Sequence, residues 1–353
     1  FITLLKVLFI LGITVGFFAP ILTWVERKQS AIMQDRIGAN RADILGFRAL
    51  GLFHIMADGL KMFTKEDFIP KGANPVLHTL SPIIALIPAI ITFTVVPFGG
   101  VYELFGKQVN LVIADLDVGL LFVFAIASIA TYGYVIAGWS SNNNWSLLGS
   151  MRTTAQMISY EVTMGLTIIG VLMVYGSMKL TEIGSMQEEF LSWGIFLQPL
   201  GFIMFFAASI AENKRIPFDN PEAESELVAG YFTEYSGLKF GMFFMAEFIE
   251  MVTIAAIVTI LFFGAWHIPF ITTTTMLSFF DIFGSSGANI LVMLIHVGVF
   301  FAKVVILIWV QMTIRWTLPR FRYDQIMKLG WKILLPLSLA NIFILLTRTS
   351  LSI

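Results

Sequence analysis

The chain has 353 residues, of which 57% are hydrophobic and 13% charged, with a net charge of −1 and a mean hydropathy of +0.84. A soluble domain carries about 25% charged residues, so this composition predicts a membrane protein. The near-neutral charge gives no indication of nucleic-acid binding. The absence of cysteine excludes disulfides, thiolate zinc sites and thiolate-ligated iron–sulfur clusters, and the four scattered histidines form no metal motif.

Eight apolar stretches approach the length of about 20 residues that a helix needs to cross a bilayer. We therefore expect an all-α, polytopic membrane protein with about eight transmembrane helices. The expected spans are residues 2–25, 76–98, 118–138, 154–175, 195–212, 240–263, 290–312 and 333–347. The first runs into Trp24, Glu26 and Lys28 rather than a small-residue cleavage site, which favours a span over a signal peptide. The threonine-rich segment 267–289 is expected to be a partly membrane-embedded outer loop.

Lysine and arginine are unevenly distributed among the predicted loops. The loops after the first, third, fifth and seventh spans hold 17 of the 22 basic residues, and the other loops with the C-terminal tail hold three. Loops rich in basic residues face the cytoplasm. We expect one integral-membrane domain, residues 1–353, in a bacterial cytoplasmic membrane with both termini on the non-cytoplasmic side. The expected cytoplasmic loops are 26–75, 139–153, 213–239 and 313–332.

The first cytoplasmic loop is predicted to contain an amphipathic helix at residues 46–66. His54, Asp58, Lys61 and Lys65 recur every three or four residues and form one polar stripe. A helix lying in the headgroup plane is one interpretation. The mixed charges of the stripe favour another, in which the helix lines a polar cavity or meets a protein partner.

Carboxylates lie inside the predicted spans, where a charged side chain costs ~2.5–3.5 kcal/mol on insertion scales. Glu161 and Glu247 each lie seven residues from the cytoplasmic end of a span, at a depth of about 10 Å. Glu250 follows one turn later, and Glu212 ends the fifth span. Lys303, in the seventh span, is expected to lie near these groups. A proton relay is the favoured interpretation, and buried salt bridges or neutral, hydrogen-bonded carboxylic acids are the alternative.

The fifth loop, residues 213–239, is rich in carboxylates. Five of them fall between Asp219 and Glu234, and only Lys214 and Arg215 precede them as basic residues. Two prolines keep the backbone non-helical, and apolar residues follow directly. The loop is therefore expected to be packed, although composition alone also allows a solvated acidic loop. Crowded carboxylates cannot all be ionised, so they would respond to a charge created beside them.

Four blocks of sequence carry a resemblance to a known family. They are ERK with MQDRIGANR at 26–28 and 33–41, ADGLKMFTKE at 57–66, the stretch 151–161 with PFDNPEAESEL at 217–227, and RWTLPRFRYD at 315–324. They resemble the H-type membrane subunit of respiratory complex I, the NADH:quinone oxidoreductase. The resemblance covers nearly the whole chain. One departure is Ala39, where the family usually has proline, and it bears on the rigidity of one turn.

The resemblance implies an eight-helix subunit that joins the membrane arm of the complex to its hydrophilic arm and encloses most of the quinone chamber. Quinone is then a substrate, and FMN and iron–sulfur clusters are expected only in partner subunits. The implied partners are soluble quinone-module subunits on the cytoplasmic side, small membrane subunits, antiporter-like subunits and lipid. The residues expected to line the chamber are Glu26, Arg27, Arg36, Asp58, Lys61 and Arg315. The carboxylates expected to form a proton relay are Glu161, Glu212, Glu247, Asp219, Glu222, Glu224 and Glu226.

Two other functions remain open from the sequence. A membrane-bound hydrogenase or another ferredoxin-linked complex would use a similar subunit without quinone, but the intact runs RFRYD and EAESE favour the quinone enzyme. A freestanding secondary transporter would carry inverted repeats with broken helices, and no such repeat is evident in the sequence. The identity of the copurifying partners would separate the three.

Overall fold

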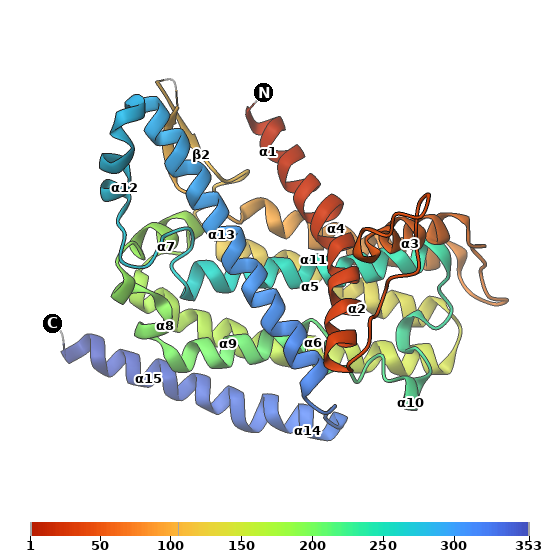
Figure 1. Ribbon diagram of the computed structural model, residues 1–353. Helices are drawn as coiled ribbons and strands as arrows, with labels where there is room; N and C mark the ends of the chain where they lie inside the picture. Colours follow the sequence, from red (N-terminus) through yellow and green to blue (C-terminus); the bar gives the residue numbers. More distant parts are fainter. Residues whose placement is uncertain (1, 105, 352–353) are drawn as a thin grey trace.

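The structure is a computed structural model that describes residues 2–104 and 106–351, and Figure 1 shows a bundle of long helices with one short hairpin. Seven segments of the described chain are helical and apolar enough to cross a membrane. They are Leu4–Met33, Pro75–Val95, Gly119–Ser140, Asn144–Tyr175, Gly237–Phe262, Ser286–Thr317 and Tyr323–Thr347. The all-α, polytopic class predicted from composition is confirmed.

The helices and strands keep their labels from Figure 1 throughout. The first part of the chain forms α1 (Ile2–Leu11), α2 (Ala19–Met33), α3 (Phe53–Thr64), α4 (Pro75–Thr92), β1 (Val101–Leu104), β2 (Lys107–Asn110), α5 (Gly119–Ser140) and α6 (Asn144–Tyr175). The middle forms α7 (Leu180–Met186), α8 (Gly194–Leu197), α9 (Pro199–Glu212), α10 (Glu224–Leu227) and α11 (Gly237–Phe262). The last part forms α12 (Thr273–Phe280), α13 (Gly284–Thr317), α14 (Tyr323–Lys328) and α15 (Leu335–Leu351).

Helix α11 lies at the centre of the bundle. In its most apolar window 78% of the residues are buried inside the molecule, against 22–50% in the other six spans. It packs against α4, α13 and α9, while α4, α5, α6 and α9 pack side by side in that order. Polar groups on α11 are therefore enclosed by protein, where only other protein groups or trapped water can satisfy them.

The fifth expected span, residues 195–212, is instead divided in two. Helix α8 ends at Leu197, Gln198 takes a non-helical conformation, and α9 begins at Pro199. Proline is favoured in the first turn of a helix because it lacks the N–H that would be unpaired there. The 14 residues of α9 extend about 21 Å, which is shorter than the ~30 Å hydrocarbon core. Glu212 thus ends a short helix packed against α6, α11 and α15.

Other helices extend beyond the predicted spans. Helix α6 begins at Asn144 rather than at 154, because the side chain of Asn143 caps it by accepting from the Trp145 N–H at 2.9 Å. Glu161 therefore lies near the middle of a 32-residue helix. Helix α2 continues to Met33, so Glu26 lies on a helix rather than in a loop.

The amphipathic helix predicted at 46–66 is shorter than expected. Helix α3 covers only Phe53–Thr64, and the preceding residues form a turn in which Leu50 and Gly51 have φ of 55° and 87°. A Cβ at Gly51 would lie 2.0 Å from the carbonyl oxygen of Ala39, so glycine is required there. The hydrophobic spacing continued through this turn, which is why periodicity placed the helix start too early.

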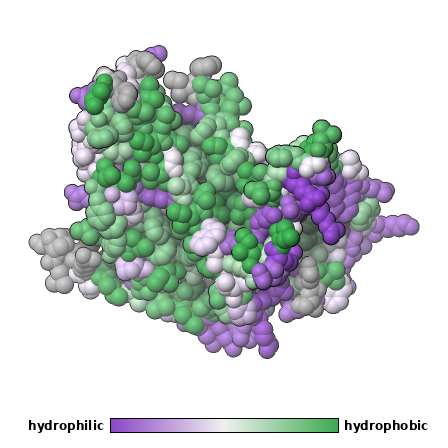
Figure 2. Space-filling view, in the orientation of Figure 1, coloured by the Kyte–Doolittle hydropathy of each residue, from purple (hydrophilic) through white to green (hydrophobic). Residues whose placement is uncertain are grey.

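A hydrophilic region marks one side of the molecule. Figure 2 shows hydrophobic residues over most of the visible face, with hydrophilic residues gathered where α3 and α10 lie. The loop between α9 and α11 lies on this side and packs against α5 and α6. On the opposite side the β1–β2 hairpin packs against α13, where the Tyr102 hydroxyl lies 2.5 Å from Nδ1 of His296.

The segment 267–289 was expected to be a partly membrane-embedded outer loop. It contains α12 and the first residues of α13, joined by a short 3₁₀ turn. Its position relative to a bilayer stays a prediction.

Lys303 does not lie among the carboxylates as expected. Its Nζ donates to the carbonyl oxygens of Phe263, Ala265 and His267 at 2.7, 3.1 and 2.6 Å, at and beyond the C-terminal end of α11. The ammonium group also lies 4.4 Å from the Trp193 ring centroid. A cation at a helix C-terminus satisfies the unpaired carbonyls and the helix dipole. Lys303 is therefore a capping residue of the central helix.

Replacing Lys303 by methionine is expected to destabilise the protein by ~1–3 kcal/mol, because buried carbonyl oxygens lose their donor. The melting temperature of the purified protein in detergent would fall. Lys328→Met is the matched control, because Lys328 is exposed on α14. Equal melting temperatures for the two variants would show that the capping contacts contribute nothing to stability.

Candidate functional site

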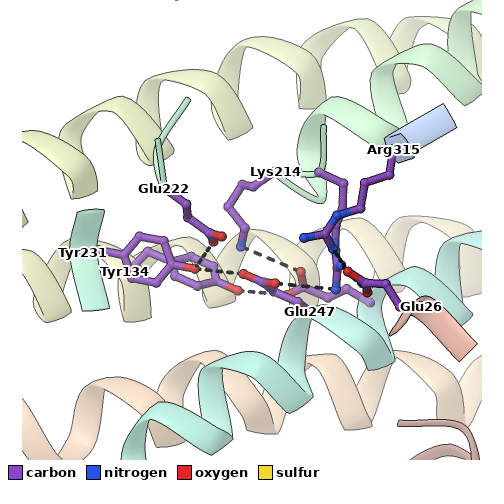
Figure 3. A network of polar contacts seen from close by, with 9 residues as sticks. Glu26, Tyr134, Lys214, Glu222, Tyr231, Glu247 and Arg315 are labelled. Atoms are coloured by element: carbon purple, nitrogen blue, oxygen red, sulfur yellow. Dashed lines mark hydrogen bonds and ion pairs between the residues drawn. The ribbon is translucent and has the colours of Figure 1, made fainter. Parts of the chain in front are cut away.

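Alternating basic and acidic side chains form a row inside the bundle (Figure 3). Arg315 on α13 forms an ion pair with Glu26 on α2. Arg215, just after α9, places Nη1 3.0 Å from Oε2 of Glu26 and Nη2 3.6 Å from Oε2 of Glu247 on α11. Glu26, Arg215 and Glu247 are each less than 10% exposed. Burial of such charges is tolerated because each has a partner of opposite sign.

Tyr231 continues the row from Glu247 to Glu222. Its hydroxyl lies 3.0 Å from Oε1 of Glu247 and 2.9 Å from Oε1 of Glu222. A phenol hydroxyl has one proton to donate and can accept a second hydrogen bond. Both contacts are hydrogen bonds only if one of the two carboxyl groups is protonated and donates to the tyrosine oxygen. The geometry therefore fits a pair of carboxyl groups that share one proton through Tyr231.

The loop carboxyls nearest this bridge have raised pKa values. Burial raises the pKa of Glu222 well above its ordinary value, and the charge of Glu247 adds to the shift. Burial also raises the pKa of Asp219 to about 6, although Arg320, whose Nη2 lies 2.8 Å from Oδ2, opposes the shift. A raised pKa makes a carboxyl group easier to protonate, and such shifts are common at functional sites.

Lys214 and Tyr134 lie beside the row. The Lys214 ammonium is 3.4 Å from the Tyr134 ring centroid and 4.0 Å from Oε2 of Glu250. The Tyr134 hydroxyl donates to Glu250 at 3.5 Å. The Lys214 side chain is fully buried, so its charge is held by a ring face and one carboxylate rather than by water.

A small cavity separates Glu250 from Glu212. Its volume is about 50 Å³, and Asn213 also lines it, with apolar side chains of α5, α6, α9 and α11. A water molecule needs about 10–15 Å³ measured in this way, so the cavity has room for a few waters. Glu161 on α6 does not line the cavity but accepts a hydrogen bond from the Ser128 hydroxyl on α5.

The structure brings some of the expected relay residues together and leaves others apart. Glu222 and Glu247 belong to the charged row, and Glu212 borders the adjoining cavity. Asp219 pairs with Arg320. Glu226 is exposed and pairs with Arg152 at 2.6 Å, apart from the row. The side chain of Glu224 lies outside the described residues.

The expected chamber residues also divide into two groups. Glu26 and Arg315 lie in the charged row. Arg27 and Asp58 pair at 2.7 Å on a more exposed surface between α2 and α3. Arg36 is exposed, with its Nε donating to the side chain of Gln34 at 2.7 Å, and Lys61 is exposed on α3. Within the described residues, neither Arg36 nor Lys61 forms an ion pair with the row.

Several members of the site were not chosen from the sequence. They are Tyr134, Lys214, Arg215, Tyr231 and Arg320. Two signals pointed to the basic ones, since Lys214 and Arg215 are the only cations before an acidic loop and Arg320 follows a span. The tyrosines carried no signal, because a lone tyrosine in an apolar helix or loop is ordinary core composition.

The fold and this row define a polytopic α-helical membrane protein with ionisable groups enclosed in its bundle, the setting in which membrane proteins place charge-coupled chemistry. Residues 5–346 match the family model described as NADH dehydrogenase. The chain belongs to this family, and the resemblance to the H-type membrane component of complex I is confirmed.

The curated relatives agree with the family model, and all three described below are H-type subunits of NADH-quinone oxidoreductase. The chain is 45% identical over 322 residues to the relative from Cytophaga hutchinsonii, covering 91% of this chain and 89% of that protein. It is 46% identical over 333 residues to a relative from Geobacter sulfurreducens, covering 91% and 88%. It is 42% identical over 352 residues to the relative from Bdellovibrio bacteriovorus, covering 92% and 90%. These relatives are components of an oxidoreductase complex.

Proposed function

We propose that this chain forms most of the quinone chamber of a proton-pumping NADH:quinone oxidoreductase and couples quinone reduction to proton movement through its buried carboxyl groups. The observation that carries the proposal is the bridge from Glu247 through Tyr231 to Glu222. At this bridge one proton can reside on either of two carboxyl groups. A row of ion pairs connects the bridge to Arg315. The quinone itself is the substrate, and FMN and iron–sulfur clusters belong to partner subunits.

Charge created by quinone reduction is proposed to act first on Arg315 and Glu26. A new charge beside this pair changes the electrostatic interactions of Arg215, which contacts both Glu26 and Glu247. Buried charges interact strongly because little water screens them. The proton shared at Tyr231 then shifts between its two carboxyl groups.

The proton path is proposed to continue away from the chamber. Waters in the cavity between Glu250 and Glu212 would carry a proton from the row toward α9, and Glu161 would receive it next. The other carboxylates of the acidic loop would respond to the charge created in the chamber; they are Asp219, Glu224 and Glu226. The destination is the antiporter-like subunits beside this chain.

The exposed chamber residues are proposed to serve the mouth of the quinone site. Arg27, Asp58, Arg36 and Lys61 lie on or near α2 and α3, and the soluble quinone-module subunits would cover them. Charged side chains at these positions would suit the recognition of the polar quinone head group or of a partner subunit.

The chain is proposed to span a bacterial cytoplasmic membrane as a single domain over residues 1–353. Both termini would lie on the non-cytoplasmic side, and the segments 26–75, 139–153, 213–239 and 313–332, which include helix ends, would face the cytoplasm. The excess of basic residues in those loops supports this orientation. Small membrane subunits and lipid would surround the remaining faces.

Arg315→Gln tests the chamber assignment. We expect NADH oxidation with quinone to fall about tenfold per assembled complex, since the loss of a charged contact is worth ~1.5–3 kcal/mol. Oxidation of NADH by a hydrophilic artificial acceptor should be unchanged, because such acceptors take electrons before the chamber. Glu26 keeps Arg215 as a partner, so assembly should survive.

Arg322→Gln is the matched control for this experiment. Arg322 lies in the same segment, and its side chain is 80% exposed. Both activities should be unchanged in this variant. An Arg315→Gln complex that assembles normally and reduces quinone at the parental rate would remove Arg315 from the chamber.

A further inference from the structure

An apolar groove lies between α1, the β1–β2 hairpin and α13, and no residue of the charged row lines it. Figure 2 shows a hollow between the N-terminal end of α1 and the block that contains α12 and α13. The volume is about 640 Å³, within the range of ~300–1,000 Å³ typical of ligand pockets. The lining residues are Leu5, Lys6, Phe9, Phe98, Lys107, Val109, Leu111, Met293, Leu294 and Val297.

Two lysines are the only charged residues of this lining. Lys6 donates one hydrogen bond from Nζ to the carbonyl oxygen of Val112 at 3.0 Å. An ammonium group has three N–H donors, so two are available to a ligand. Lys107 is exposed and takes part in none of the ion pairs found within residues 2–104 and 106–351. The groove therefore carries net positive charge at an otherwise apolar surface.

The hairpin register separates the nearby acidic group from the groove. Lys107 pairs with Leu104, and Gln108 pairs with Glu103. Side chains alternate between the two faces of a strand, so Lys107 and Val109 share the face toward the groove. Glu103 and Gln108 share the opposite face, so Glu103 does not neutralise Lys107 within the groove.

Asp115, the acidic residue whose charge acts on Lys6, has partners of its own outside the groove. Asp115 lies 3.1 Å from the Lys179 ammonium, and Thr181 and Asn110 donate to its carboxylate. Its charge is thus largely balanced outside the groove. Neither lysine of the groove is held in a strong ion pair of its own.

We propose that this groove binds an anionic membrane phospholipid. The headgroup phosphate would lie between Lys6 and Lys107, and an acyl chain would lie along the apolar residues of α1 and α13. Lysines near the end of a membrane helix reach the headgroup level with their charge and cover apolar surface with their stems. The charge selects an anionic headgroup, and the apolar lining selects a lipid over a soluble phosphate. The proposal does not depend on the quinone chamber.

The test is lipid binding to the whole purified complex after delipidation, followed by native mass spectrometry. Phosphatidylglycerol and phosphatidylcholine with the same acyl chains are the two probes, and glycerol phosphate without acyl chains is a third. The parent complex should bind phosphatidylglycerol with a clear preference over both others. Lys107→Gln should weaken this binding about fivefold and Lys6→Gln with Lys107→Gln about 30-fold, because each lysine near a lipid headgroup contributes a factor of about five.

Gln108→Glu is the matched control, because it changes the charge by the same amount as Lys107→Gln on the opposite face of the hairpin. It should leave phosphatidylglycerol binding unchanged. Leu294→Trp fills the groove without touching the lysines and should also prevent binding, which keeps the test decisive if the lysine variants assemble poorly. Equal binding of both phospholipids, undiminished binding in the double variant, or no uptake by the parent because a neighbouring protein of the complex fills the groove would each overturn the proposal.

Discussion

Replacing Arg215 by methionine is expected to reduce the amount of assembled complex in the membrane at least tenfold. Arg215 is 8% exposed and lies between Glu26 and Glu247 at 3.0 and 3.6 Å. Without it, Glu247 loses its cation and Glu26 keeps only Arg315. Removing one partner of a buried ion pair costs ~3–5 kcal/mol, far more than the pair contributes over an apolar substitute. A loss of ~3 kcal/mol is about a hundredfold in an equilibrium constant.

Arg152→Met is the matched control for Arg215→Met. Arg152 pairs with Glu226 at 2.6 Å, but both side chains are more exposed, at 29% and 48%. Surface ion pairs contribute ~0–1 kcal/mol, so this variant should assemble nearly as well as the parent. The measurement is the amount of assembled complex in native gels of solubilised membranes. Parental amounts of the Arg215→Met complex would show that the row is not held together by its charges.

Glu247→Gln is expected to lower quinone reduction coupled to proton movement at least tenfold while assembly survives. Arg215 keeps Glu26 as a partner, so no cation is left unpaired. Glutamine keeps the size of the side chain but cannot exchange a proton, and positioned acid–base groups contribute ~10²–10⁴ to a rate. Glu247→Asp should retain more activity, because the titrating group remains and is slightly displaced.

The same substitution at Glu212 and Glu161 separates the relay from a structural role. Glu212 borders the cavity and Glu161 binds Ser128, so glutamine at either site should also lower coupled activity without lowering assembly. Coupled turnover in vesicles is measured beside the amount of complex. Full assembly with full coupled turnover in all three glutamine variants would leave these carboxyl groups as structural residues.

The class of the fold followed directly from composition, because an apolar span of about 20 residues has few other stable states. The break before Pro199 was less evident. Hydropathy runs through Gln198 without interruption. The non-helical residue is held by contacts that the sequence does not show, including a hydrogen bond from its side chain to the Gly170 carbonyl oxygen at 2.5 Å and one from its backbone N–H to the Gly194 carbonyl oxygen at 2.8 Å. The start of α3 was predicted wrongly for the same reason. Position 51 must be glycine because the carbonyl oxygen of Ala39, twelve positions earlier, leaves no room for a Cβ.

The carboxylates of the site were predictable because an acid in an apolar span is costly and therefore informative. Their partners were not. Glu26 was assigned to the chamber on resemblance alone, while its pairing with Arg215 joins residues 189 positions apart. Lys303 was misplaced because periodicity gives the face of a helix and not the neighbour that the face meets. Tyr231 could be recognised only when Glu222 and Glu247 were both located.

A proton is proposed to pass between Glu222 and Glu247 through Tyr231. Tyr231→Phe removes only the hydroxyl that joins them and leaves every charge of the row in place. Tyr160→Phe removes an equally buried hydroxyl whose partner, at 2.8 Å, is the carbonyl oxygen of Ile326, away from the row. Each change should cost about 1 kcal/mol of stability, so both complexes should assemble.

The most direct measurement is therefore the coupled turnover of these two variants in vesicles, per assembled complex. The proposed relay predicts a loss of about tenfold or more in Tyr231→Phe, because the proton loses its acid–base bridge, and parental turnover in Tyr160→Phe. Parental turnover in both variants, or the same loss in both, would contradict proton transfer through Tyr231.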